Sequence, residues 1–194
     1  MLFRSRALVD FAEALAVPVK FLCLLDYANS RGALDMGLTP ELLPGYEEVE
    51  HLEPGGQAGM HLGEMVTSEL SALWVVGANP LKQSRDGVPS GPGALQRKAA
   101  FLVVQDLFLT ETAQQADVVL PAASAYEKNG TVTNTSGEVQ RLTRAIHTMG
   151  AKTDLEIMGF LAREMGAAAA LGPWVPETVW AEIQIGRASY RERV

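Results

Sequence analysis

The feature that most constrains the fold is a series of three short apolar segments, each followed directly by residues that turn the chain. The segments are 72–76, 100–104 and 117–120. Continuous apolar runs of this length are typical of strands that are buried on both faces. Strands that alternate with helical connections indicate a parallel sheet with right-handed crossovers. The sequence therefore predicts an α/β fold built on a parallel sheet.

The segments around this core have weaker patterns. Apolar residues at helical spacing predict an amphipathic helix over 155–165, which Gly166 would end. Thr112 and Gln115 have the spacing of a capping box, which predicts a helix of about two turns over 110–115. The remaining predictions are a strand over 19–25, helices over 7–15 and 64–70, and loops over 29–37, 87–93 and 131–136.

Both ends of the chain resemble translated sequencing-adapter DNA. The segment 185–194 differs from the adapter-encoded peptide IGRASCRERV only at Tyr190, and the segment 2–5 resembles the opposite strand of the same adapter. The alternative for 185–194 is a genuine basic tail. We therefore expect adapter-derived ends and a truncated protein between them. The expected units are 1–5 and 185–194 from adapters, 6–70 as a partial α/β segment with loops, 71–166 as the parallel α/β core, and 167–184 as a truncated C-terminal segment.

Composition excludes several classes of function. A net charge of −7 argues against a nucleic-acid partner, which would need a basic patch. No apolar run approaches the roughly 20 residues that cross a bilayer, so direct membrane insertion is not expected. The only cysteine, Cys23, lies within an apolar run, and the three histidines are widely separated. The sequence therefore predicts no metal site and no iron–sulfur cluster in this chain.

Candidate ligand-binding residues follow the first two predicted core strands. Ligands of parallel α/β sheets bind at the carboxyl ends of the strands. Gly77 would permit close backbone approach, Asn79 and Gln105 offer amide groups, and Asp106 can accept hydrogen bonds from a guanine or ribose. The alternative is that these residues only turn the chain, because the sequence has neither a dinucleotide fingerprint nor a P-loop. No nucleophile has a base at a recognisable spacing, so no catalytic residue is predicted.

Several segments together resemble the molybdopterin oxidoreductase family. They are 104–123 (VQDLFLTETAQQADVVLPAA), 127–134 and 137–140, preceded in the same order by 28–37, 43–45 and 77–80. The resemblance implies the parallel-sheet, Rossmann-like portion of a domain of that family. It also implies that one pterin dinucleotide, if retained, would be lined by Gly77, Asn79, Gln105, Asp106 and Thr110.

Two branches of the family fit these segments. One branch binds a molybdenum or tungsten bis-pterin dinucleotide and includes formate dehydrogenase alpha subunits. The other is the large peripheral G-type subunit of bacterial NADH–quinone oxidoreductase, respiratory complex I, which keeps the fold and has generally lost the pterin. Segments 125–127, 135–140 and 152–157 look like the respiratory branch. Moreover, 136–138 reads Ser-Gly-Glu where molybdenum enzymes often have arginine-rich residues, so the resemblance favours the respiratory branch.

The respiratory resemblance implies a structural, catalytically silent domain within an electron-transfer subunit. Iron–sulfur clusters would be held by the amino-terminal part of that subunit, and this chain would bind no cofactor. Its partners would be other subunits of the peripheral arm, on the cytoplasmic, inner face of the bacterial plasma membrane. The alternative branch implies molybdopterin guanine dinucleotide, with the metal ligand outside this chain. In either case, the chain alone is expected to be inactive.

Overall fold

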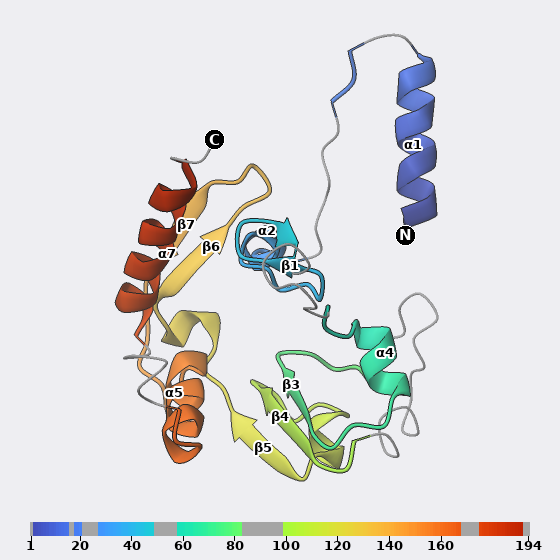
Figure 1. Cartoon of the computed structure of the whole chain (residues 1–194). Coiled ribbons are helices and arrows are strands. Elements are labelled where there is room, and N and C mark those ends of the chain that lie inside the picture. Colours follow the sequence, from blue (N-terminus) through green and yellow to red (C-terminus); the bar gives the residue numbers. More distant parts are fainter. Residues whose placement is uncertain are drawn as a thin grey trace.

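The computed structural model describes residues 2–15, 18–20, 27–48, 58–82, 99–167 and 175–191. Its central feature is a three-stranded parallel sheet in the order β3-β4-β5 (Figure 1). The strands are β3 (Leu73–Val76), β4 (Leu102–Asp106) and β5 (Val118–Pro121). This confirms the predicted parallel sheet, although β4 extends further than predicted and includes Gln105 and Asp106. The strands keep their sequence order, so the described sheet has no reversal of strand order of the kind that favours ligand binding.

The core lies on one face of this sheet. Val75 pairs in register with Val104, and both are buried together with Leu102 and Ala113. Burial on both faces, predicted from the apolar runs, holds only for β4. On the outer strands, Trp74 is 40% exposed and Val118 is 38% exposed. The sheet is therefore packed around its central strand, and its outer strands leave apolar side chains partly exposed.

Helix α5 (Asp154–Glu164) shows why its sequence forms a helix. The Thr153 hydroxyl accepts a hydrogen bond from the Glu156 N–H at 3.4 Å, and the Glu156 carboxylate accepts one from the Thr153 N–H at 2.8 Å. This reciprocal capping box satisfies backbone donors that a helix start leaves free. Gly166, with φ of +76°, lies just beyond the helix in the left-handed region. The predicted helix and its stop are confirmed.

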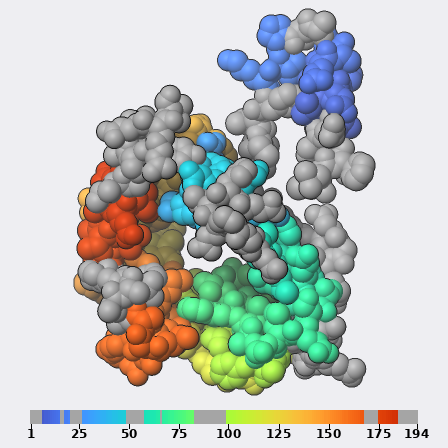
Figure 2. All heavy atoms as spheres, in the orientation of Figure 1, coloured from blue at the N-terminus to red at the C-terminus, as the bar shows by residue number. Residues whose placement is uncertain are grey.

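The other helices include α1 (Leu2–Ala14), α4 (Leu62–Thr67) and α7 (Pro176–Arg191). α1 and α4 match the predicted helices at 7–15 and 64–70, with each starting earlier than predicted. α1 stands apart from the sheet, α5 and α7 in both views (Figure 1 and Figure 2). None of the helices in the described part of the chain is both long and apolar enough to span a membrane.

Three local predictions are wrong. The predicted loop over 29–37 contains helix α2 (Ser30–Asp35), in which Arg31 bonds to Asp35 one turn later. The predicted helix over 110–115 is only a 3-10 turn, η1 (Ala113–Gln115). The predicted loop over 131–136 is largely an antiparallel hairpin of β6 (Gly130–Thr133) and β7 (Val139–Leu142). A tertiary contact links two of these segments: the Asn29 side chain at the start of α2 accepts a hydrogen bond from the Thr133 N–H of β6 at 2.9 Å.

Two smaller elements complete the described chain. β1 (Leu42–Leu43) and β2 (Glu47–Glu48) form a short antiparallel pair, and η2 (Ala125–Glu127) is a second 3-10 turn. Most of the predicted strand over 19–25 and all of the predicted loop over 87–93 lie outside the described residues. The expected adapter boundaries fall inside α1 and α7, and the division into units stays a prediction.

Candidate functional site

Gly77 lies at the carboxyl end of β3 and has a backbone that favours glycine. Its φ is +59°, and a Cβ built on it would meet no atom within 4 Å. Its N–H donates to the Gln105 carbonyl at 2.9 Å, which holds the end of β3 against β4. Gly77 therefore combines a left-handed turn with open space beside the backbone.

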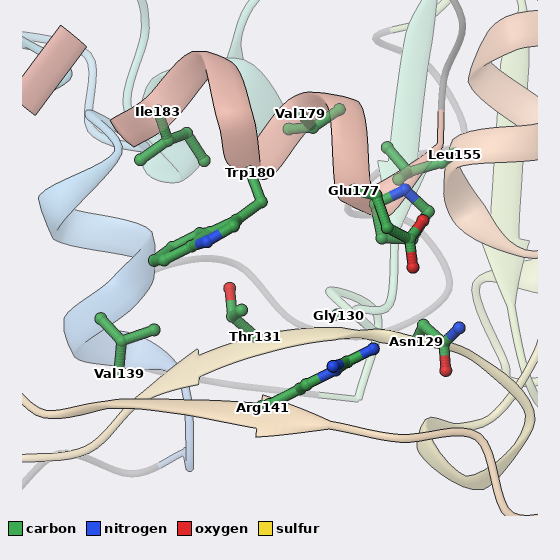
Figure 3. Close-up of a pocket in the computed structure, with 11 residues that line it drawn as sticks. Asn129, Gly130, Thr131, Val139, Arg141, Leu155, Glu177, Val179, Trp180 and Ile183 are labelled. Atoms are coloured by element: carbon green, nitrogen blue, oxygen red, sulfur yellow. The ribbon is translucent and has the colours of Figure 1, made fainter. Parts of the chain in front are cut away.

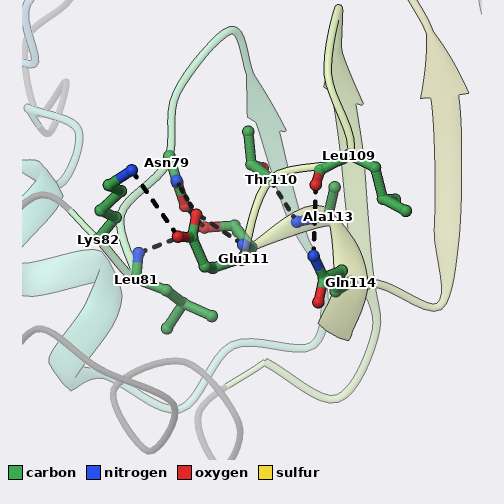
Figure 4. A network of polar contacts seen from close by, with 9 residues as sticks. Asn79, Leu81, Lys82, Leu109, Thr110, Glu111, Ala113 and Gln114 are labelled. Atoms are coloured by element: carbon green, nitrogen blue, oxygen red, sulfur yellow. Dashed lines mark hydrogen bonds and ion pairs between the residues drawn. The ribbon is translucent and has the colours of Figure 1, made fainter.

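Asn79, two residues further on, is the centre of a hydrogen-bond network (Figure 4). Its side-chain oxygen accepts from the Thr112 hydroxyl at 2.7 Å and from the Thr112 N–H at 3.2 Å. Its Nδ2 donates to the Glu111 carboxylate at 2.6 Å. Thr112 is fully buried, and its hydroxyl also accepts from the Leu81 N–H at 3.2 Å. Both ends of the Asn79 amide are thus bonded to residues that follow β4.

Glu111 is the charged member of this network. The hydrogen bond from Asn79 lowers the pKa of the Glu111 carboxyl below its ordinary value, with a smaller contribution from nearby Lys82. The Lys82 ammonium lies 3.9 Å from that carboxylate, and both side chains are more than half exposed. Solvent screening keeps the ion pair weak.

Asp106 and Thr110 lie at the two ends of the turn that leaves β4. The Asp106 carboxylate accepts from the Phe108 N–H at 3.1 Å, and the Thr110 hydroxyl accepts from the Ala113 N–H at 3.2 Å. The second Asp106 oxygen has no partner among the described residues. Between these turns, Phe108 and Leu109 are largely exposed. Asp106 and Thr110 therefore stabilise this turn, as the chain-turning alternative expects.

Gln105 points elsewhere. Its side chain is fully buried, and its Nε2 donates to the Asp154 carboxylate at 2.7 Å. The other Asp154 oxygen binds the Lys128 ammonium. Successive side chains of a strand point to opposite faces, so Gln105 and Asp106 diverge. The buried Gln105 Oε1 has no hydrogen-bond partner among the described residues.

The structure thus divides the five candidate residues. Gly77, Asn79, Asp106 and Thr110 lie around the carboxyl ends of β3 and β4, whereas Gln105 joins the sheet to the start of α5. We call the former set, together with its partners Glu111 and Thr112, the strand-end network.

Four further residues that make these hydrogen bonds and ion pairs were not predicted as site residues from the sequence. They are Glu111, Thr112, Lys128 and Asp154. Thr112 had a detectable signal, its spacing from Gln115, but its hydroxyl bonds to Asn79 and Leu81 and not to the turn that follows it. Lys128 follows Glu127 directly, a neighbour pair that is usually solvated, and only the fold brings it to Asp154. In the described part of the chain, no three His, Cys, Asp or Glu side chains are grouped as a metal site would need.

Comparison with known proteins gives one family and several relatives. The model of the molybdopterin oxidoreductase family matches residues 11–164. The F420-dependent formate dehydrogenase subunit alpha of Methanocaldococcus jannaschii is 37% identical over 84% of the chain. A putative formate dehydrogenase of Bacillus subtilis and a G-type subunit of the NADH-quinone oxidoreductase of Rhizobium meliloti are each 37% identical, over 74% and 72% of the chain. The chain spans only 26%, 16% and 18% of these relatives, respectively.

Proposed function

The chain belongs to the molybdopterin oxidoreductase family, and we propose that it is a structural, catalytically silent part of an NADH–quinone oxidoreductase-type electron-transfer subunit. The observation that carries this proposal is the strand-end network. Polar side chains at the edge where the family would hold a dinucleotide are bonded to one another. Such an edge holds the domain together and has few free groups for a ligand.

The cost of freeing these groups supports the proposal. If Asn79 turned toward a ligand, the buried Thr112 hydroxyl would lose the acceptor for its proton. A buried polar group without its partner costs about 1–3 kcal/mol. A ligand would have to replace this hydrogen bond before it gained any affinity from Asn79. The network is therefore better suited to stabilising the fold than to exchanging its internal hydrogen bonds for bonds to a ligand.

The hairpin supports the same branch. Glu138 stands where molybdenum enzymes resembling this chain often have arginine-rich residues. Its carboxylate accepts from the Asn134 Nδ2 at 2.9 Å, while its N–H donates to the Asn134 Oδ1 at 2.9 Å. In this chain Glu138 is therefore bonded within the tip of the hairpin.

A formate dehydrogenase-type molybdenum or tungsten subunit is the second candidate. The names of the relatives in Methanocaldococcus jannaschii and Bacillus subtilis favour it. The residues fit a pterin dinucleotide only in part. Gly77 would offer open backbone and Asp106 a carboxylate oxygen, whereas Asn79 is internally bonded and Gln105 is buried. When bound, the pterin would supply the metal that exchanges electrons with the substrate.

Further parts of the proposal concern the parent subunit. The sheet would be part of a larger Rossmann-like sheet there. Further segments would cover its faces, because Trp74 and Val118 on its outer strands are partly exposed and parallel sheets are usually covered on both faces. Iron–sulfur clusters would lie in the amino-terminal part of that subunit. Neighbouring subunits of a peripheral arm, on the cytoplasmic face of the membrane, would contact the domain. The name of the Rhizobium meliloti relative supports only the assignment to one subunit of a multisubunit NADH-quinone oxidoreductase.

Metal analysis of the full-length parent subunit tests the proposal. We expect no molybdenum or tungsten above background by plasma mass spectrometry, no pterin fluorescence after oxidative release, and no formate-dependent dye reduction. One molybdenum or tungsten atom per subunit would contradict the proposal of a catalytically silent domain and would support a formate dehydrogenase-type subunit.

A variant pair then locates any pterin that is found. Gly77→Val fills the open space beside β3, and Gly150→Val is its control, because Gly150 also has a positive φ and an open Cβ position. Under the second candidate, only Gly77→Val lowers the pterin content. Equal loss in both variants would show that the pterin does not depend on the strand-end network.

A further inference from the structure

A groove lies between the β6–β7 hairpin and α7, away from the strand-end network (Figure 3). Its volume is about 500 Å³, within the range of small-molecule sites. The lining residues come from the hairpin, α7 and the start of α5; those used below are Asn129, Val139, Arg141, Glu177, Trp180 and Ile183. All of them precede Ile185, where the expected adapter-derived segment begins. The groove therefore includes no residue of that expected segment.

One end of the groove is apolar. The Trp180 indole projects from α7 toward Val139 on the hairpin, with Ile183 one turn further along the helix (Figure 3). All three side chains are only partly buried, so each has apolar surface that a ligand could cover. A flat indole between two branched side chains suits an aromatic or branched aliphatic group.

The other end carries opposite charges that are not paired. The Arg141 guanidinium points along the hairpin toward Asn129, and Glu177 projects from α7 above that end (Figure 3). Neither Arg141 nor Glu177 has an ion-pair or hydrogen-bond partner within the part of the chain that the structure describes. The Asn129 side-chain oxygen accepts from the Arg144 N–H at 2.9 Å, which leaves its amide N–H groups available as donors.

We propose that this groove binds a free amino acid with an aromatic or branched side chain. Arg141 would bind the carboxylate, Glu177 the ammonium group, and Trp180 the side chain. A guanidinium binds a carboxylate through two parallel hydrogen bonds. A simple anion would be repelled by Glu177 and a simple cation by Arg141, so a zwitterion matches both charges. The groove shares no residue with the strand-end network, so this proposal does not rest on the proposed function.

Binding to the 194-residue chain tests the proposal directly. We would titrate L-phenylalanine and L-leucine by calorimetry and tryptophan fluorescence, and expect a Kd on the order of 1 mM or tighter. The comparison ligands are 3-phenylpropionate, which lacks the ammonium group, and phenethylamine, which lacks the carboxylate. Each should bind at least about tenfold more weakly, because one charged side chain then lacks its partner.

Matched variants test the residues. Arg141→Met and Glu177→Gln should each weaken L-phenylalanine binding by about tenfold or more. Arg144→Met and Glu182→Gln are the controls and should leave the Kd unchanged. Arg144 lies just beyond the end of β7 and Glu182 lies on α7, and neither residue lines the groove. Circular dichroism monitors folding. If either Arg141→Met or Glu177→Gln unfolds, the Kd measured for the other variant still tests the proposal.

Three results would overturn the proposal. One is the absence of binding by both amino acids up to their solubility. Another is equal affinity for the amino acid and for the ligands that lack one charge. The third is equal weakening by the lining variants and their controls. None of these results would alter the metal analysis of the parent subunit, so the two proposals fail separately.

Discussion

The strand-end network and the groove differ in how their polar groups are partnered. In the strand-end network, Asn79 and Thr112 bond to each other, and Thr112 is fully buried. In the groove, Arg141 and Glu177 have no partner among the described residues and line an open volume of about 500 Å³. The comparison separates residues that stabilise the chain from residues that remain available to bind. Among the candidate residues predicted from the sequence, Asn79 belongs to the first kind.

This difference has an energetic consequence. Removing one partner from a buried hydrogen bond leaves the other group desolvated and unpaired, which costs about 1–3 kcal/mol. Removing an exposed polar group costs little, because water replaces the lost contact. Substitutions in the sheet and its strand-end network should therefore lower stability, and matched substitutions in the groove should not.

The largest effect is expected in the core beneath the strand-end network. Val104→Asp places a charge at a fully buried position of the central strand, among the apolar side chains of Val75, Leu102 and Ala113. It should lower the free energy of unfolding by about 3 kcal/mol or more, measured by urea denaturation with circular dichroism. Val118→Asp, at a position 38% exposed on an outer strand of the same sheet, is the control and should cost much less. Equal losses would show that the core does not lie where the structure puts it.

An intermediate effect compares the two regions directly. Thr112→Val keeps the side-chain shape but leaves the Leu81 N–H without its acceptor and removes the donor to Asn79. It should lower the free energy of unfolding by about 1–3 kcal/mol. Thr131→Val makes the same change at an exposed position in the groove and should stay within about 0.5 kcal/mol of the parent. Equal stability of Thr112→Val and Thr131→Val would contradict the claim that the strand-end network stabilises the fold more than the groove residues do.

The smallest expected effect is a change in the pKa of the Glu111 carboxyl within the strand-end network. The hydrogen bond from Asn79 should hold the Glu111 carboxyl pKa below its ordinary value, and Asn79→Ala should return it toward that value, as measured by NMR titration of the carboxyl carbon. Because the folded pKa is the lower one, the associated stabilisation is present at neutral pH. It is lost as the pH falls through the folded pKa. Lys82→Met is the control and should shift the pKa less; a Glu111 pKa at or above the ordinary value would contradict the network.

The parallel sheet and α5 were predictable because their signals are local. Each strand is an apolar run that ends at a turn, and α5 has its capping residues and its stopping glycine within its own segment. These features depend on the chemistry of neighbours in sequence, which the sequence displays directly. The resemblance to the family came from the same contiguous segments, and the matched family model confirms it.

Other features depended on contacts between distant segments. The bond between Asn29 and Thr133, 104 residues apart, links α2 to the hairpin. Gln105 faces the interior because Asp154, 49 residues later, bonds to its amide, and Thr112 bonds to Asn79 33 residues earlier. No pattern within a short window reveals such pairs.

Short-range patterning fixes the type of each element, so the amino-acid sequence was enough to predict the class of fold, the three strands of the parallel sheet and the family. The tertiary structure decided which polar groups are satisfied, that Gln105 is buried, and that Arg141 and Glu177 meet across a groove. Hydrogen-bond satisfaction and burial are properties of the packed chain, because each depends on which distant atoms exclude water from a side chain.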